Sequence, residues 1–249
     1  MLIINADDLG RDDEATDSAM ECFHSGRITS ASFMVFMADS RRAAELAKKA
    51  GIETGLHLNF TEKFTAPDCP PQVLKYQERI RRFLKPRKRT HILYYPFLRR
   101  DFRLVIEAQF QEFRRLLGQA PSHFDGHQHM HLSTNILAEK LIPPGQKVRR
   151  NFSCLSGDNP GGLFKRTYLK AVDAFLSRNY LLTDYFFSLS DRRKLEIEHK
   201  RIERVLRLAG NSNVELMVHP QKQAERRFLL GQEFNRLLEG VTIGTHSMV

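Results

Sequence analysis

The strongest constraint on how this chain can fold lies in its first ten residues, Met-Leu-Ile-Ile-Asn-Ala-Asp-Asp-Leu-Gly. A short apolar run, residues 2–4, followed almost at once by Asp7 and Asp8 predicts a buried strand that delivers carboxylates to a pocket at its C-terminal end. Two adjacent carboxylates repel each other in a poorly solvated site, and a bound cation removes that repulsion. An Asp-Asp pair can also form a turn or cap a helix. The hypothesis to test along the chain is that Asp7 and Asp8 are one half of a metal-dependent site.

Strand and helix patterns alternate over the first sixty residues. Residues 13–25 and 39–50 have helical patterns that end at glycines, whereas 28–36 and 52–59 have strand patterns. This alternation is typical of parallel βα units. The chain has 249 residues, 41% of them hydrophobic, which is enough for one large core. We therefore expect an α/β fold, a TIM-barrel-like (β/α) barrel in regular or irregular form, as a single domain over residues 1–249.

The segment 61–103 interrupts this rhythm and is predicted to be an insertion. Five prolines break it, which argues against long regular elements. Between Arg79 and Arg103 there are ten Lys or Arg residues and one acid, so this stretch supplies most of the net charge of +10. A nucleic-acid-binding domain more often has a basic face built from many elements, and we expect no nucleic-acid partner. A solvated loop and a peripheral membrane contact through residues 79–103 are the alternatives left open.

Nothing in the sequence indicates a membrane span or a secretory signal, because no run of 18 apolar residues occurs and the N-terminus lacks a basic and apolar leader. The three cysteines are scattered and odd in number, which suits a reducing compartment. A cytoplasmic location is therefore expected.

Histidines gather in one segment, His-Phe-Asp-Gly-His-Gln-His-Met-His at 123–131. If the last five residues are extended, His127, His129 and His131 share one face of a strand. His57 and His219 each come at or near the end of another predicted strand, and either one alone could be a hydrogen-bonded core histidine. However, the acids at the start of the chain and these histidines all fall at the C-terminal ends of predicted strands, the edge where (β/α) barrels build their active sites.

One carboxylate and two imidazoles form an open three-ligand metal site with positions left for water and substrate. Such a metal polarises a carbonyl group and acidifies water, while a neighbouring carboxylate accepts a proton and a histidine donates one. These parts suit metal-assisted hydrolysis of an amide or ester.

The segments at 4–10, 51–59, 123–131 and 217–220, in this order and spacing, closely resemble the YdjC-like carbohydrate deacetylases, which include chitooligosaccharide deacetylases and relatives associated with hopanoid biosynthesis. The resemblance implies a TIM-barrel-like fold, a homodimer and a divalent metal, with Mg²⁺ favoured. Zn²⁺ or another transition metal is the alternative that two histidines suggest. The resemblance is weakest over 61–103, where the substrate is normally framed.

Carried over by position, the resemblance gives each candidate residue a role. The metal ligands would be Asp8, His57 and His127. The general base would be Asp7, and His219 would be a general acid or would stabilise the tetrahedral intermediate. Residues that contact the substrate or support these groups would be Asp125, His129, His131, Arg149 and Arg150, with no choice made between the two arginines.

The function expected from the resemblance is removal of acetyl groups from an N-acetylated sugar or glycolipid. Because the chain has no tryptophan, stacking against a sugar ring would fall to Tyr94, Tyr95, Tyr185 or Phe187. The competing functions are metal-dependent hydrolysis of another amide or of a phosphoester, and non-enzymatic binding to nucleic acid or an anionic surface.

Overall fold

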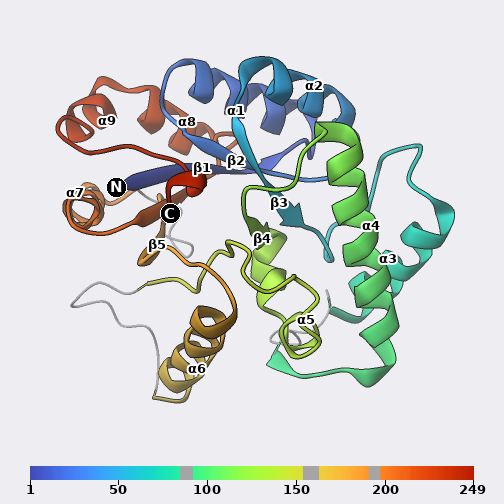
Figure 1. Ribbon diagram of the computed structural model, residues 1–249. Coiled ribbons are helices and arrows are strands. Elements are labelled where there is room, and N and C mark those ends of the chain that lie inside the picture. The colour runs from blue at the N-terminus through green and yellow to red at the C-terminus, as the bar shows by residue number, and fades with distance from the viewer. Residues whose placement is uncertain (85–91, 154–162, 191–196) are drawn as a thin grey trace.

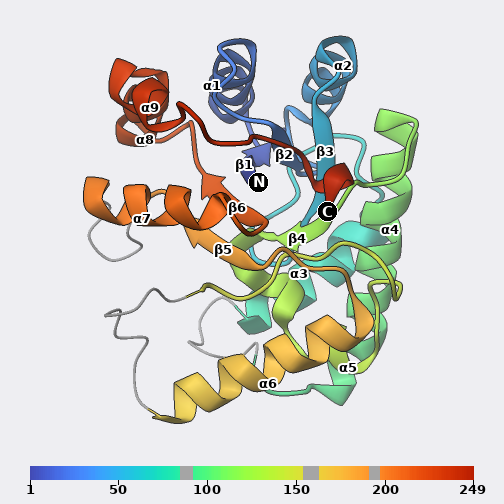
Figure 2. The ribbon, with the colours of Figure 1, turned by 60° about the vertical axis from the view of Figure 1, so that its left-hand side comes forward.

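The computed structural model describes residues 1–84, 92–153, 163–190 and 197–249. Its six strands form one parallel sheet in the order β4-β3-β2-β1-β6-β5. The strands are β1 (Leu2–Leu9), β2 (Ser30–Phe33), β3 (Glu53–Leu58), β4 (Phe124–Gly126), β5 (Tyr185–Ser188) and β6 (Val214–Val218). The sheet curls, with helices on its outer side (Figures 1 and 2). The predicted α/β fold is confirmed, while a complete TIM barrel stays a prediction.

Nine α-helices occur within the described residues. They are α1 (Asp13–His24), α2 (Ser40–Ala50), α3 (Pro71–Leu84), α4 (Arg99–Leu117), α5 (Thr134–Ala138), α6 (Leu163–Asn179), α7 (His199–Ala209), α8 (Gln223–Leu230) and α9 (Gln232–Leu237). The same described residues also contain three 3₁₀ helices, η2 (Pro96–Leu98), η3 (His127–Leu132) and η4 (His246–Met248). No helix in these ranges has both the length and the apolar character of a membrane span.

Local sequence signals explain several of these boundaries. Asp12 caps α1 by accepting a hydrogen bond from the backbone N–H of Ala15, and Gly51 ends α2 in the left-handed conformation.

The prediction that prolines exclude a long element from 61–98 is wrong. Pro71 is the first residue of the 14-residue helix α3, where its missing N–H costs nothing. Residues 85–91 of the predicted insertion lie outside the described residues.

The gap between the sheet edges β4 and β5 is crossed by residues 146–153. Phe124 in β4 donates to the carbonyl of Lys147 and accepts from the N–H of Arg149, and Ser153 donates to the carbonyl of Phe186 in β5. Lys147 and Val148 pair with neighbouring segments only through isolated bridges. This crossing segment matters for the site, because it carries Arg149 into the space enclosed by the curled sheet.

The concave side of the sheet is polar, whereas its outer side is apolar. Because side chains alternate along a strand, Asn5 and Asp7 face inward from β1 while Ile4 and Ala6 face the helices. Ser30 and Ser32 in β2 and Glu215 in β6 also face inward, and all of these polar residues are buried. The core that holds the fold together therefore lies between the sheet and the helices, and the enclosed space is available for charged groups.

Candidate metal-binding active site

The end of β1 is bent so that two neighbouring acids reach the same space. Asp8 has a φ of 71°, and the pairing of β1 with β2 shifts register between Ala6 and Leu9. In a regular strand, Asp7 and Asp8 would point to opposite faces. The left-handed backbone at Asp8, uncommon for a residue other than glycine, removes that constraint. Both carboxylates line one cavity of about 190 Å³.

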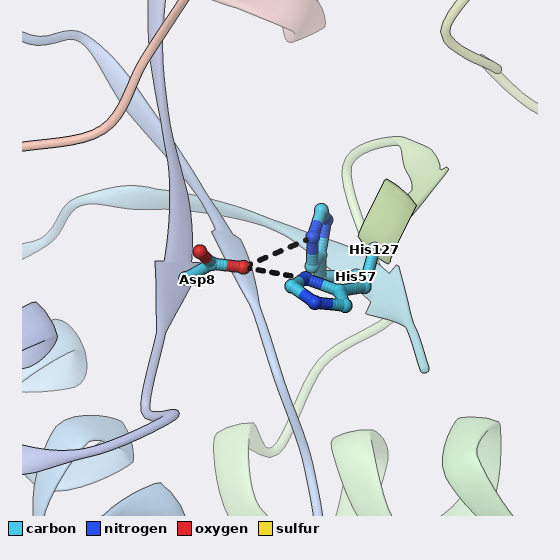
Figure 3. Close-up of side chains that lie close together, drawn as sticks. All are labelled: Asp8, His57 and His127. Atoms are coloured by element: carbon cyan, nitrogen blue, oxygen red, sulfur yellow. Dashed lines mark hydrogen bonds and ion pairs between the residues drawn. The ribbon is translucent and has the colours of Figure 1, made fainter. Parts of the chain in front are cut away.

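Asp8, His57 and His127 converge on one point (Figure 3). Asp8 Oδ1 lies 3.0 Å from His127 Nδ1 and 3.4 Å from His57 Nε2. One potential ligand atom from each residue lies within 4.8 Å of the others. Donor atoms around a single cation with bonds of about 2.1 Å are separated by roughly 3–3.5 Å. The carboxylate and two imidazoles are thus placed where they could hold one ion.

Each of the three groups is held in place by further residues. Asp8 Oδ2 accepts hydrogen bonds from Arg11 and Gln221 at 3.0 and 2.9 Å, which leaves Oδ1 to face the histidines. The ring of His57 contacts Asp125 through Nδ1 at 2.8 Å, because His57 and Asp125 are paired across β3 and β4. A carboxylate on one imidazole nitrogen orients the ring and leaves the other nitrogen for a metal.

Glu62 plays the same part for His127, with Oε2 lying 3.3 Å from His127 Nε2. The loop that carries Glu62 is fixed by its backbone. Asn59 Oδ1 accepts from the N–H of Glu62, and the side-chain amides of Asn59 and Gln77 donate to its carbonyl. The carboxylate of Glu62 is therefore aimed at His127 by an ordered turn.

The charges in the site shift the pKa values of the proposed ligands. Burial alone would raise the pKa of Asp8, but its hydrogen bonds with His127 and His57 hold that pKa well below the usual range. Burial alone would lower the pKa of His57, but Asp125, Asp7 and Asp8 together raise it to about 10. The carboxylates around His57 therefore favour a positive charge at this point of the cavity.

Arg149 is buried and forms ion pairs with three carboxylates. Its Nη atoms bind both oxygens of Asp7 at 2.8 and 2.7 Å, and its Nε donates to Glu215 at 2.7 Å. A third ion pair, at 2.5 Å, joins Arg149 to Asp125. Burial would lower the pKa of Arg149, but the carboxylates, Asp125 first, raise it well above normal. Arg150 points away, toward Asp173 and the carbonyl groups of Thr183 and Asp184. Of the two arginines, Arg149 is the one that contacts the site.

The two other histidines of the segment 127–131, His129 and His131, take different positions. His127–Leu132 is a 3₁₀ turn with left-handed Gln128 and His129, so the prediction of an extended segment is wrong. The close packing at Gly126 supports this turn, since a Cβ there would lie 2.8 Å from the backbone nitrogen of His131. His129 lines the cavity, whereas His131 is buried and donates from Nε2 to the carbonyl of Arg149.

His219 lines the cavity at the end of β6. A buried carboxylate, Glu225 in α8, accepts from the backbone N–H of His219 at 2.7 Å and from the hydroxyl of Ser190 at 2.6 Å. Burial lowers the pKa of His219, and Asp7 and Asp8 partly oppose this shift. Ser190 thus helps to hold the carboxylate of Glu225 in place.

Sequence reasoning missed several residues of the site. Glu215 could have been identified from the sequence, since it is the one acid in an otherwise apolar strand. Arg11, Glu62 and Gln221 lie in loops, whose course no periodicity predicts. The cavity is lined by Asp7, Asp8, His57, Gly126, His127, Gln128, His129, Ser188, Ser190, Met217, His219 and Lys222. The four aromatic side chains expected to stack against a sugar are not among these lining residues.

Two other groups of described residues have donor atoms close enough to hold an ion, but their contacts account for them otherwise. Asp7, His57 and Asp125 form one group, in which Arg149 supplies the positive charge. The second contains His123 and His246, whose rings stack face to face with centroids 3.6 Å apart. The lone pairs of imidazole nitrogens lie in the plane of the ring. The nitrogens of two stacked rings therefore do not point toward one shared ion. We therefore place the candidate metal centre at Asp8, His57 and His127.

Comparisons with known proteins show which family this chain is related to. The chain is 32% identical over 239 residues to a human protein named carbohydrate deacetylase, covering 88% of this chain and 74% of the human one. It is 29% identical over 136 residues to a chitooligosaccharide deacetylase of Proteus mirabilis, covering 55% and 52% of the two chains.

A solved structure from Enterococcus faecalis, titled as a cellobiose-phosphate cleavage protein, shares the fold with a TM-score of 0.68 at 18% identity. The match covers 99% of this chain and 97% of the other. The family model described as YdjC-like protein matches residues 1–240. The chain therefore belongs to the YdjC-like protein family.

Proposed function

We propose that this protein is a metal-dependent carbohydrate deacetylase that hydrolyses the acetamide group of an N-acetylated sugar, free or linked to a lipid. The observation that carries the proposal is the convergence of Asp8, His57 and His127 beside the Asp7–Arg149 pair in one cavity. Membership of a family that contains carbohydrate deacetylases supports the choice of an amide substrate over a phosphoester.

The donor set fits a divalent cation. Asp8 presents one oxygen, and each imidazole presents the nitrogen opposite its carboxylate partner. A bound cation would polarise the acetamide carbonyl and lower the pKa of water. The family resemblance favours Mg²⁺, whereas two imidazole ligands suit Zn²⁺ or another transition metal.

The reaction needs a base, and Asp7 is the carboxylate placed for it. Arg149 holds both oxygens of Asp7 in one plane, and Asn5 donates to Oδ1 at 3.0 Å. In the proposed mechanism, Asp7 removes a proton from the attacking water, and the hydroxide adds to the carbonyl carbon. Arg149 orients Asp7, since its two hydrogen bonds fix the plane of the carboxylate.

Collapse of the tetrahedral intermediate requires a proton on the departing nitrogen. His219 lines the same cavity as Asp7, and Glu225 fixes its backbone. We assign His219 to donate to that nitrogen, so that the C–N bond breaks and acetate and a free amino sugar are released. His129, Gln128 and Lys222 are left to contact the sugar.

The test combines metal binding with product analysis. We expect purified protein to bind a divalent cation and to release acetate from N-acetylated sugars but no phosphate from matched phosphoesters. His127→Ala should weaken metal binding beyond detection by calorimetry, whereas His199→Ala, which lies away from the cavity, should bind as the wild type does. Unchanged binding in His127→Ala, or phosphate as the released product, would overturn the proposal.

A second prediction concerns Glu62. Glu62→Gln removes the carboxylate that faces His127 Nε2, so His127 becomes a poorer ligand and metal affinity should fall about tenfold or more. Titration of the metal-free protein measures this effect without relying on activity. Glu107→Gln, an exposed change on α4, is the matched control, and an equal affinity in both variants would show that Glu62 does not support His127.

Three further expectations remain proposals. We propose that residues 1–249 act as one deacetylase-like domain with 61–103 as an insertion, that the protein forms a homodimer, and that it is cytoplasmic. Limited proteolysis, light scattering of the purified protein and cell fractionation test these three points separately.

A further inference from the structure

Exposed apolar side chains gather just before α4. Leu93 is 61% exposed, Tyr94 37% and Phe97 58%, and these are half of the six large exposed hydrophobic residues in the described chain. Single exposed apolar residues are ordinary on protein surfaces, but several together mark a surface that binds something. We call Leu93, Tyr94 and Phe97, with the exposed Arg82, Arg99 and Arg100, the Phe97 patch.

The aromatic residues of the Phe97 patch are held in place by ring packing and hydrogen bonds. The ring of Phe97 packs edge-on against Phe83 and Tyr95, with centroids 5.1 and 5.8 Å apart. Tyr95 is tied to α5 by two hydrogen bonds, since its N–H donates to Asn135 Oδ1 and its carbonyl accepts from Asn135 Nδ2. The hydroxyl of Tyr94 donates to Glu139 at 2.7 Å. The apolar side chains are therefore held outward by packing beneath them.

The patch lies on the same side of the molecule as the cavity. It directly precedes α4, and a helix that follows a strand in a parallel α/β unit begins near the C-terminal edge of the sheet. It is also bound to α5, which follows the η3 turn that begins with His127. Figure 1 shows the chain leading into α4 beside α5, below the ends of β3 and β4.

Positive charge surrounds the apolar centre. The side chains of Arg82 and Arg99 are 78% and 56% exposed, and Arg100, the next residue after Arg99, is also exposed. Glu78 and Glu139 offset part of this charge through ion pairs. The three arginines of the patch still outnumber these two acids. The patch as a whole favours an anionic partner.

We propose that the Phe97 patch docks onto the surface of an anionic lipid bilayer. Basic side chains are attracted to anionic headgroups, and aromatic and aliphatic side chains enter the region between headgroups and acyl chains. The phosphates of a nucleic acid could pair with the arginines, but its bases would have no ring to stack on at Leu93. The proposal stands apart from the deacetylase function, because it uses none of the groups that line the cavity.

Sedimentation with vesicles tests the proposal on the full chain. The protein should sediment with phosphatidylcholine vesicles that contain phosphatidylglycerol, less so at high salt, and not with phosphatidylcholine alone. The double variant Leu93→Ser, Phe97→Ser keeps every charge, and its affinity for the anionic vesicles should fall roughly tenfold or more. Leu181→Ser, which removes a leucine that is 51% exposed and lies outside the patch, should bind as the wild type does.

A second double variant helps to distinguish a loss of vesicle binding from a loss of the fold. Arg82→Glu with Arg100→Glu reverses two exposed charges and should abolish binding to anionic vesicles, while circular dichroism checks that both double variants are folded. A folded double variant of either kind that binds anionic vesicles as tightly as the wild type would overturn the proposal, as would an absence of binding by the wild type. Displacement of the vesicles by a single-stranded oligonucleotide at equal salt would replace it with nucleic-acid binding.

Discussion

Asp7→Asn is expected to lower kcat by about 10²–10⁴-fold, the usual contribution of a positioned general base. The amide has the shape of the carboxylate and can still accept from Arg149 through its oxygen, but it cannot take a proton from water. Metal affinity should stay close to that of the wild type, because Asp7 is not among the three proposed ligands. Steady-state release of acetate and calorimetric titration with the metal measure the two quantities on the same preparation.

The adjacent acid provides the contrast. Asp8→Asn changes the residue whose Oδ1 faces both histidines, so it should lose metal affinity and turnover together. Turnover close to that of the wild type in Asp7→Asn would remove Asp7 from the mechanism, whatever the behaviour of Asp8→Asn.

Arg149→Met is expected to destabilise the fold by about 3–5 kcal/mol, the usual cost of leaving buried charges without their partner. Asp7, Asp125 and Glu215 would remain buried around an apolar side chain. Urea unfolding followed by circular dichroism measures the loss as a lower midpoint at an unchanged slope. If Arg149→Met does not fold, Arg149→Lys replaces it. That variant keeps the charge but not the paired hydrogen bonds, and we expect an intermediate loss.

The neighbouring arginine is the control for this measurement. Arg150 is partly exposed and pairs with Asp173, so Arg150→Met should cost about 1 kcal/mol or less. An Arg149→Met protein as stable as the Arg150→Met protein would show that the buried carboxylates do not depend on Arg149.

The positions of several strands could be predicted from the sequence because they depend on local patterns. Apolar runs that end in Asp, His or Asn mark the ends of β1, β3 and β6, and parallel strands bring those ends to one edge. This reasoning, together with the family resemblance, predicted that Asp8, His57 and His127 lie close together. Their role as metal ligands stays a prediction.

The parts that could not be predicted depend on contacts distant in sequence. The turn at His127–Leu132 requires left-handed backbone at Gln128 and His129, which a period-two pattern of histidines does not reveal. The choice between Arg149 and Arg150 depends on how residues 146–153 cross between the sheet edges. Pro71 was interpreted as a helix breaker, although proline is also a good first residue of a helix.

The guanidinium of Arg149 has a consequence for how this protein can change over time. One cation is shared by the proposed base, by the partner of His57 and by an acid of β6, so altering any one carboxylate changes the electrostatic field at the other two. Effects of substitutions at contacting positions do not add. Variation at these four positions should therefore occur in concert among descendants of this chain, and laboratory evolution that changes them singly should find few functional intermediates.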